Sequence, residues 1–329
     1  MSGGYLDRSL NEFTGLKDGS VTMMCRMPMN IVFASNRSYA EHLAVSMCSL
    51  FENNKGSSFD VYIVNADFDE RSWGALDVIA KRYGHKLIDV KILDHDLEGL
   101  ATPFHLSKET YYRLFIPQKL QVPKVLYLDS DIVVTGSICE LYDSNVDDCY
   151  LGAVRVPGFD RHKDLEMSED AKYFNAGVML INVASWRRDH IKERVIDFVQ
   201  RKPWAVHFAD QCGLNSVING RWKELHPRFN VQGCFFEADI DACAASFPEG
   251  ELMDAVQRPV IVHYSGSGKP WQFRYKHPYR GLYWQYLRKT PFNHMFSKDL
   301  TVFRVIKWFF PKAVKRAVKN AMNRGSEQG

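Results

Sequence analysis

Two aspartates separated by one residue, Asp129-Ser130-Asp131, stand between the apolar runs Val-Leu-Tyr-Leu and Ile-Val-Val. In an extended chain, residues i and i+2 project to the same side, so the two carboxylates converge on one point. Converging carboxylates repel each other unless a cation lies between them, which makes the pair a candidate site for a hard metal ion. A solvated acidic turn is the alternative interpretation. Acids framed by buried strand are costly without a partner, and this favours the metal site.

His263 ends a second apolar run, residues 260–262, and is followed by two glycines and a lysine. A lone histidine is more often structural than a ligand, but Gly266 and Gly268 allow backbone N–H groups to approach an anion. Lys269 adds a point charge for phosphate. An imidazole and two carboxylates, with diphosphate oxygens completing the shell, suit Mn²⁺ or Mg²⁺, and the imidazole favours manganese.

Two further segments, residues 173–177 and 209–215, are rich in amide side chains. Tyr-Phe-Asn-Ala-Gly is typical of an entry into a strand, and Ala-Asp-Gln-Cys-Gly-Leu-Asn is typical of a helix start. Together they supply amides and a carboxylate of the kind that hydrogen-bond sugar hydroxyls. Neither segment alone would indicate a sugar site.

The chain around these residues alternates between short apolar runs and segments with helical spacing. This pattern predicts right-handed βαβ crossovers and a mostly parallel sheet, in which ligands bind at the carboxyl ends of the strands. The first expected helix starts at a capping box of Ser38 and Glu41, and Gly84 ends the second. Gly-x-Gly-x-x-Gly and Walker signatures are absent, so a nucleotide would be held in another way. We expect strands at Asn30–Ala34, Asp60–Val64, Lys86–Ile92, Val125–Leu128, Tyr150–Val154, Ala176–Ile181 and Val260–Val262, and later helices at Arg71–Tyr83 and Ala184–Gln200.

The composition narrows the class of protein. With 329 residues, the chain is long enough for one large α/β domain with additions. A net charge of +3, without a basic stripe interleaved with aromatics, argues against a nucleic-acid partner. The seven cysteines include no Cys-x-x-Cys pair, so we expect reduced thiols rather than a disulfide framework. No apolar run approaches the roughly 20 residues of a membrane-spanning helix, and the N-terminus lacks a signal-peptide core, so we expect a cytoplasmic protein.

The chain changes character after Phe292. Apolar residues recur at helical spacing from Val302 to Ala321, accompanied by lysines and arginines, and Pro311 divides the segment into two short helices. Basic amphipathic helices with neighbouring aromatics are typical of segments that bind anionic lipid surfaces. An ordinary helix packed on the domain is the alternative, because amphipathicity alone does not distinguish the two. We favour the membrane surface.

Six segments follow one another in order between Asn30 and Phe292: IVFAS-x-x-x-YA, TYYRL, KVLYLDSDIVV, YFNAGVMLIN, ADQCGLN and VHYSGSGKPW. In this order they resemble the retaining glycosyltransferases of glycosyltransferase family 8. The likeness is strongest to the bacterial lipopolysaccharide galactosyl- and glucosyltransferases, with glycogenin a more distant relative. The resemblance implies an α/β fold of GT-A type, a single Rossmann-like nucleotide-sugar-binding domain over residues 30–292. An extension over residues 1–29 would precede it, and the basic tail over residues 293–329 would follow.

The resemblance also implies a role for each residue of the candidate site. The uracil and ribose would lie against Ala34, Asn36 and Tyr39, with Tyr39 stacked on the base. The metal would be bound by Asp129, Asp131 and His263, and Ser130 would lie in the donor site. The diphosphate would be held by Gly266 and Lys269, and the donor would also contact Arg113. The transferred sugar would be lined by Asn175 and by the catalytic residues Asp210 and Gln211.

Three positions depart from the common family pattern. Asn36 stands where an aspartate is frequent and Ser38 where an asparagine is frequent, although the carbonyl of Asn36 can still accept from the uracil N3–H. Cys212 replaces an acid that is often found after the Asp-Gln pair and that has been a candidate nucleophile. Without it, a double displacement would need Gln211, a poor nucleophile, or Asp210. We therefore expect front-face substitution, in which the leaving phosphate helps to deprotonate the acceptor.

These residues together predict a metal-dependent retaining hexosyltransferase that uses a UDP-hexose. We expect it to transfer galactose or glucose to a lipid-linked saccharide acceptor, in lipopolysaccharide or other surface polysaccharide synthesis, at the inner face of the cytoplasmic membrane. A catalytically silent nucleotide-sugar binder and a glycogenin-like self-glucosylating enzyme are the alternatives. Cys212 favours the silent binder, whereas the metal aspartates, His263 and Lys269 argue against it. A nucleotidyltransferase would carry a Gly-rich basic phosphate loop, which residues 30–39 lack.

Overall fold

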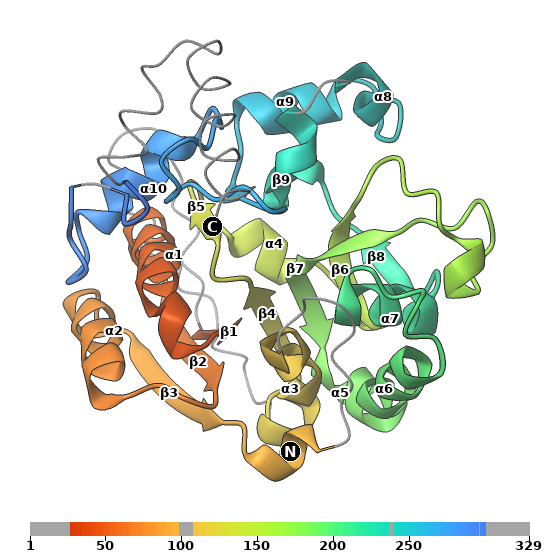
Figure 1. Cartoon of the computed structure of the whole chain (residues 1–329), viewed down its shortest axis with the longest axis horizontal. Coiled ribbons are helices and arrows are strands. Elements are labelled where there is room, and N and C mark those ends of the chain that lie inside the picture. Colours follow the sequence, from red (N-terminus) through yellow and green to blue (C-terminus); the bar gives the residue numbers. More distant parts are fainter. Residues whose placement is uncertain (1–26, 99–107, 237–239, 296, 301–329) are drawn as a thin grey trace, which may run out of the picture.

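The structure, a computed structural model, describes residues 27–98, 108–236, 240–295 and 297–300. Most of the expected N-terminal extension and the expected tail helices lie outside the described residues. Within them, the chain forms two sheets flanked by helices (Figure 1). No helix in the described ranges is both long and apolar enough to cross a membrane.

The larger sheet has the strand order β3-β2-β1-β4-β7-β6-β8 among the described residues. The pairs β3–β2, β2–β1, β1–β4 and β6–β8 are parallel, whereas β7 runs antiparallel to both β4 and β6. The expected mostly parallel sheet is therefore confirmed, with one reversed strand, β7, between β4 and β6. Its strands are β1 (Met29–Ala34), β2 (Phe59–Asn65), β3 (Lys86–Lys91), β4 (Lys124–Leu128), β6 (Leu151–Arg155), β7 (Phe174–Asn182) and β8 (Trp222–Glu224).

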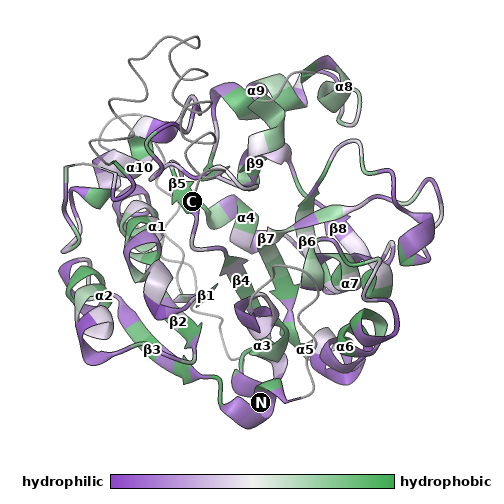
Figure 2. Ribbon diagram, viewed as in Figure 1, coloured by the Kyte–Doolittle hydropathy of each residue, from purple (hydrophilic) through white to green (hydrophobic). Residues whose placement is uncertain are grey.

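Helices cover both faces of this sheet because neighbouring residues of a strand point to opposite sides. In β1, Ile31 and Phe33 pack in the cluster that contains α1 (Ala40–Asn53) and α2 (Glu70–Arg82). Val32, between them, packs in the other cluster, with α5 (Val183–Arg188), α6 (Ile191–Arg201) and α7 (Ala209–Ile218). The central strands are buried on both faces, and Figure 2 shows them largely hydrophobic, whereas the helices carry both colours.

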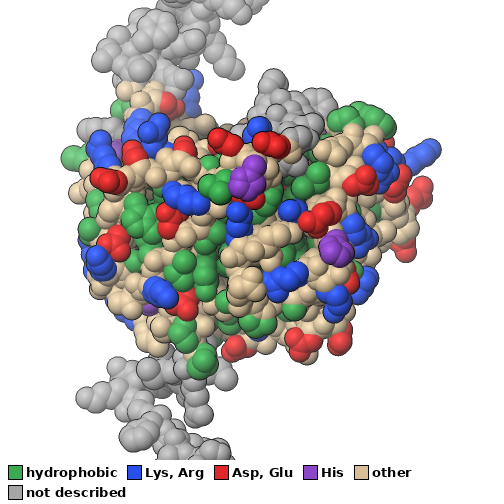
Figure 3. Space-filling view, turned by 90° about the horizontal axis from the view of Figure 1, so that it is seen from below, with side chains coloured by type: hydrophobic (Ala, Val, Ile, Leu, Met, Phe, Trp, Pro, Cys, Tyr) green, Lys and Arg blue, Asp and Glu red, His purple; other side chains and the backbone are tan. Residues whose placement is uncertain are grey.

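Shorter elements complete the fold. They are α3 (Ile116–Lys119), α4 (Cys139–Asp143), α8 (Ile240–Ala244), α9 (Glu251–Gln257), α10 (Arg280–Leu287) and the 3₁₀ helices η1 (Arg37–Tyr39), η2 (Asp94–Leu97), η3 (Lys108–Phe115), η4 (Lys163–Leu165), η5 (Pro227–Phe229) and η6 (Gly233–Phe236). The face seen in Figure 3 carries acidic and basic side chains side by side, so charge of one sign does not gather into a single patch there.

Two of the expected helix boundaries were wrong. Ser38 does not cap α1, whose N-cap residue is Tyr39 and has no side-chain cap hydrogen bond. Asn36 instead caps η1, and its side-chain carbonyl accepts from the Tyr39 N–H and from the Ser38 hydroxyl. The expected single helix from Ala184 to Gln200 is divided into α5 and α6. His190 interrupts it in a left-handed conformation, with φ 52°, which is incompatible with a continuous right-handed helix.

A smaller sheet of β5 (Ile132–Val134), β10 (Ile261–His263) and β9 (Val231–Gln232) brings distant parts of the sequence together. β5 follows β4 after only three residues and pairs antiparallel with β10, so that His263 lies opposite Ile132. The Tyr264 N–H donates to the Asp131 carbonyl at 3.0 Å and extends this pairing. The small sheet thus places the end of β10 beside the turn between β4 and β5.

The C-terminal part of the described chain packs on α1. Tyr286 of α10 is hydrogen-bonded to Asn53 at 2.6 Å. Glu41, in the first turn of α1, is only 5% exposed and accepts from the His294 imidazole at 2.8 Å and from the Lys298 ammonium. The first residues after the expected domain boundary at 292 are therefore held against α1 by ion pairs.

Candidate active site

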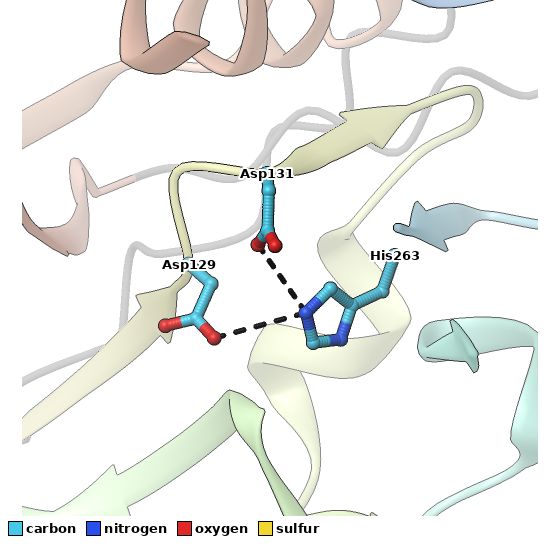
Figure 4. Close-up of side chains that lie close together, drawn as sticks. All are labelled: Asp129, Asp131 and His263. Atoms are coloured by element: carbon cyan, nitrogen blue, oxygen red, sulfur yellow. Dashed lines mark ion pairs between the residues drawn. The ribbon is translucent and has the colours of Figure 1, made fainter. Parts of the chain in front are cut away.

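The side chains of Asp129, Asp131 and His263 face one another at the junction of the two sheets (Figure 4). The His263 Nε2 lies 3.7 Å from the Asp129 Oδ2 and 3.3 Å from the Asp131 Oδ1. One ligand atom from each residue lies within 4.8 Å of the others, a spacing that suits a single cation. The expected convergence of the two carboxylates is therefore observed, together with the imidazole that the sequence placed 132 residues after Asp131.

Gly177 of β7 allows this close approach. A Cβ atom at this position would lie 2.2 Å from the His263 Cε1 and 2.7 Å from the Asp129 Oδ2. Both distances are shorter than any van der Waals contact, so every other residue would push the cluster apart. The Gly177 carbonyl also accepts from the Asp129 N–H at 2.8 Å, which fixes the chain at the end of β4.

Lys269 neutralises one side of the cluster. Its ammonium forms an ion pair with the Asp131 carboxylate and donates to the Tyr264 carbonyl at 2.8 Å. Burial alone would raise the pKa of Asp131, but Lys269 and His263 outweigh it and hold that pKa below its ordinary value. Burial likewise opposes the charge on Lys269, and the Asp131 carboxylate outweighs it and raises the pKa of the ammonium. Both groups are therefore charged.

Arg113, in η3, connects this cluster with the start of α7. Its guanidinium lies 3.3 Å from the Asp129 carboxylate and 2.9 Å from the Asp210 carboxylate. It also donates to the Ala176 carbonyl at 2.5 Å and lies over the ring of Tyr127, 4.7 Å from the centroid. Burial disfavours the charge, but the two carboxylates outweigh it and raise the pKa of Arg113 further.

Asp210 is a buried carboxyl with an unusual environment. It is only 2% exposed, and burial raises its pKa to about 6 although Arg113 opposes that shift. Its Oδ2 lies close to Arg113, yet it accepts no hydrogen bond of good geometry. The preceding Ala209 has φ 45°, a conformation that L-residues adopt at a cost, and it begins the helix that carries Asp210. The Asp210 carboxyl is therefore held against Arg113 at the start of α7.

The amide residues form a hydrogen-bonded group next to Asp210. The Gln211 Oε1 accepts from the Ala176 N–H at 3.0 Å and from the Asn175 Nδ2 at 3.4 Å. Its Nε2 donates to the Tyr173 hydroxyl at 3.1 Å, and that hydroxyl lies 3.3 Å from the Cys212 sulfur. The side chain of Gln211 is thus fixed at both ends by the protein.

A pocket of about 210 Å³ opens beside the cluster. Its lining includes most of the residues expected to contact the nucleotide and metal, namely Ala34, Asn36, Tyr39, Arg113, Asp129, Ser130 and Asp131. The remaining lining residues were not anticipated, namely Ser35, Glu109, Thr110 and Tyr127. The expected site residues outside that lining are Asn175, Asp210, Gln211, His263, Lys269 and Gly266. The contacts above connect the first five to it, and Gly266 occupies a left-handed turn with φ 90° after β10.

Asn36 is more constrained than the sequence indicated. Its carbonyl oxygen accepts from the Ser38 hydroxyl at 2.7 Å and from the Tyr39 N–H at 3.1 Å. Its amide nitrogen donates to Glu109 at 3.1 Å. A bond from a uracil N3–H to this carbonyl would therefore have to replace one of the existing bonds. Tyr39 is 39% exposed and contacts the Trp271 ring edge-on, which leaves its ring accessible.

Two contributors to the cluster were missed from the sequence. The Tyr127 hydroxyl donates to the Asp129 Oδ1 at 2.7 Å, and its i, i+2 spacing from Asp129 along β4 is a signal that was available. Asn230 contacts the His263 Nδ1 at 3.0 Å. It lies between η5 and β9, and no motif in the sequence marks it.

Comparison with known proteins agrees with this geometry. The family model described as Glycosyl transferase family 8 matches residues 30–274. General stress protein A of Bacillus subtilis is 29% identical over 278 residues, 80% of this chain and 95% of that protein. The lipopolysaccharide 1,3-galactosyltransferase of Salmonella typhimurium is 26% identical, over 80% of this chain and 79% of that protein. The solved structure of galactosyltransferase LgtC with donor and acceptor sugar analogues is similar, with TM-score 0.72 and 26% identity over 80% of this chain and 96% of that one. The GT-A type fold and the resemblance are thereby confirmed, and the chain belongs to glycosyltransferase family 8.

Proposed function

We propose that this chain is a metal-dependent retaining hexosyltransferase that moves a hexose from a UDP-sugar to a glycan acceptor. The observation that carries the proposal is the cluster of two carboxylates and an imidazole, with ligand atoms within 4.8 Å, beside a pocket of about 210 Å³. The LgtC structure supports it, because that galactosyltransferase holds donor and acceptor sugar analogues in the same fold.

The three side chains of the cluster suit a divalent cation of the Mn²⁺ or Mg²⁺ type. Asp129, Asp131 and His263 would hold it, and the mixture of carboxylate and imidazole favours manganese. Such a cation would offset the negative charge that develops on the departing UDP. The converging carboxylates are consistent with this role, because Lys269 balances only Asp131, and Arg113 is shared between Asp129 and Asp210.

Lys269 and Arg113 would bind the donor from two sides. Lys269 lies next to Asp131, so its ammonium can pair with diphosphate oxygens when these enter the cluster. Arg113 is fixed by Asp129 and Asp210 and keeps a positive charge at the inner end of the pocket. The Asp210 carboxylate, held next to Arg113, would accept a hydroxyl of the transferred sugar.

Retention of configuration would proceed by front-face substitution. The Cys212 side chain is a buried thiol whose pKa is raised by burial, so it is not a nucleophile for the sugar. The Gln211 carbonyl already accepts from the Ala176 N–H. Asp210 is held by Arg113, which lowers the nucleophilicity of its carboxylate. The side chains near the sugar position thus favour attack by the acceptor on the face from which UDP departs.

The acceptor and the cellular location are proposed from the sequence of the tail and from one relative. We assign residues 30–292 to the catalytic domain, residues 1–29 to an extension and residues 293–329 to a tail that binds anionic lipid. The tail combines an apolar stripe with lysines and arginines. The Salmonella relative supports a lipid-linked saccharide as acceptor, since its name assigns it to lipopolysaccharide. The enzyme would then act at the inner face of the cytoplasmic membrane.

Release of UDP from a panel of UDP-sugars, with Mn²⁺ or with EDTA, tests the proposal. Wild-type protein and Asp131→Ala are compared, with Asp77→Ala as the matched control, because Asp77 pairs with Lys81 on α2. Metal-dependent release from one donor, lost in Asp131→Ala and kept in Asp77→Ala, is the expected result. Tight UDP-sugar binding without release, even with added acceptor saccharides, would instead indicate the silent nucleotide-sugar binder.

A further inference from the structure

A chain of buried amide groups lies behind the carboxylate–imidazole cluster. The His263 Nδ1 lies 3.0 Å from the Asn230 Oδ1. The Asn230 Nδ2 in turn donates to the Asn175 Oδ1 at 2.9 Å. Asn230 is 0% exposed, so its amide exchanges no hydrogen bonds with bulk water and must be satisfied by the protein.

The direction of these hydrogen bonds is fixed by the backbone. The Gly177 N–H can only donate, and it donates to the Asn175 Oδ1 at 2.9 Å. The acceptor end of Asn175 therefore faces both Gly177 and Asn230, and Asn230 must present its NH₂ group to it. The side-chain carbonyl of Asn230 therefore faces the His263 Nδ1. An amide in the opposite orientation would bring two carbonyl oxygens into contact.

We infer that Asn230 is a positioning residue that sets the tautomer of His263. Its carbonyl accepts the Nδ1–H, so the lone pair of the neutral imidazole is on Nε2, the atom that faces Asp129 and Asp131. Histidines that bind metals usually donate their other N–H to such an acceptor. The inference rests on the proposed metal-dependent function, and it adds the residue that prepares the histidine for the cation.

The same chain continues to the sugar side of the site. The Asn175 Nδ2 donates to the Gln211 Oε1 at 3.4 Å, and the Ala176 N–H supports that oxygen at 3.0 Å. The polar chain therefore runs without a gap from His263 to the start of α7. Asn230 therefore fixes the position of the His263 imidazole relative to the amides of Asn175 and Gln211.

The placement of Asn230 depends on the small sheet. β9 pairs in parallel with β10, so Gln232 lies beside His263, and Asn230 comes two residues before it. The Val260 N–H also donates to the Arg228 carbonyl at 2.8 Å, which fixes the preceding segment. An apolar residue would fill the space next to the imidazole, but it would supply no acceptor for Nδ1–H.

Mn²⁺ binding is compared among three variants of the full chain. The comparison distinguishes the hydrogen bond from Asn230 to the His263 imidazole from the space that the Asn230 side chain fills. Asn230→Asp keeps an acceptor for the imidazole, and Asn230→Leu keeps the volume without one. Asn54→Leu is the control, since Asn54 is also buried and hydrogen-bonded at both ends, to Leu50 and Ile138, away from the cluster. The Mn²⁺ dissociation constant is measured with UDP present by electron paramagnetic resonance of the free ion.

We expect Asn230→Leu to weaken Mn²⁺ binding by about 10- to 100-fold. Asn230→Asp should bind at least about tenfold more tightly than Asn230→Leu, and Asn54→Leu should stay within about threefold of wild type. Equal binding by wild type and Asn230→Leu, or an equal loss in the Asp and Leu variants, would overturn the inference.

A second measurement needs neither a variant at position 230 nor the metal. Protein with ¹⁵N-labelled histidine, metal-free at pH 8.5, is studied by long-range ¹H–¹⁵N spectroscopy, and the His263 signals are identified with His263→Gln. The expected spectrum shows a proton on Nδ1 and none on Nε2. A proton on Nε2 overturns the inference whether or not the metal binds. Failure of wild-type protein to bind Mn²⁺, with Nδ1 protonated, instead contradicts the metal-dependent function alone.

Discussion

The carboxyl of Asp210 should make folding stability depend on pH in an unusual direction. Burial is the largest cause that raises its pKa from 3.8 to about 6, with Arg113 opposing and Asp129 adding to the shift. The folded protein therefore holds this proton more tightly than the unfolded chain does. The stability that the protonated carboxyl contributes is present below about pH 4 and is lost as the pH rises to about 6. At about 1.4 kcal/mol per pH unit, the loss is about 3 kcal/mol.

Asp210→Asn isolates this effect, because the amide has the shape of the protonated acid and cannot ionise. The free energy of unfolding is measured by urea denaturation at several pH values from 4 to 8 for wild type and variant. The difference between them should shift in favour of the variant by about 3 kcal/mol across this range. Changes in hydrogen bonding that the substitution causes at every pH cancel in this comparison.

The control is Asp77→Asn, on the exposed side of α2. Asp77 pairs with Lys81 at 2.6 Å and its side chain is 33% exposed, so its charge remains hydrated. The difference between this variant and wild type should change by less than about 1 kcal/mol over the same range. If the Asp210→Asn difference is equally flat, the carboxyl is solvated in the folded protein and the assignment of its oxygen to a sugar hydroxyl loses its basis.

Three further substitutions test individual features of the structure. Gly177→Ala should weaken Mn²⁺ binding by more than about tenfold, since its Cβ would lie 2.2 Å from the His263 ring; unchanged binding in titrations with UDP would contradict this. Tyr127→Phe removes the 2.7 Å hydrogen bond to Asp129, so Mn²⁺ affinity should fall by roughly tenfold, with a similar urea midpoint as the check on folding. His190→Gly should raise the free energy of unfolding by about 0.5–1 kcal/mol, because glycine adopts φ 52° without strain, and a destabilised variant would refute the strain.

The strands of the larger sheet could be predicted because their cores are apolar runs of strand length. Asn30–Ala34, Asp60–Val64 and Lys86–Ile92 match β1, β2 and β3 within one residue at each end. Their parallel order followed from the helices between them. The direction of β7 could not be predicted, because an apolar run is equally hydrophobic in either direction. Its antiparallel pairing with β4 is set by contacts between residues about 50 positions apart.

The grouping of Asp129, Asp131 and His263 could be predicted from the sequence, but the residues that hold them in place could not. Asp129 and Asp131 are only two positions apart, in the short turn between β4 and β5, so their closeness could be expected from the sequence. Gly177 and Asn230 act on His263 only through contacts across the fold, and a single sequence carries no signal for such contacts. The expected capping box at Ser38 was wrong for a local reason. The hydroxyl of Ser38 and the N–H of Tyr39 both use the nearby carbonyl of Asn36.

The charges at the site link binding of the nucleotide to binding of the cation. Within the part of the chain that the structure describes, the carboxylates of Asp129, Asp131 and Asp210 form ion pairs with only two permanently charged side chains, Arg113 and Lys269. A diphosphate entering this cluster adds further negative charge, which buried cations cannot offset unless a metal ion enters with it. By linkage, UDP must then tighten Mn²⁺ binding by the same factor by which Mn²⁺ tightens UDP binding. Equal Mn²⁺ affinity with and without UDP would mean that Lys269 alone neutralises the diphosphate, and that the cation is not part of the donor complex.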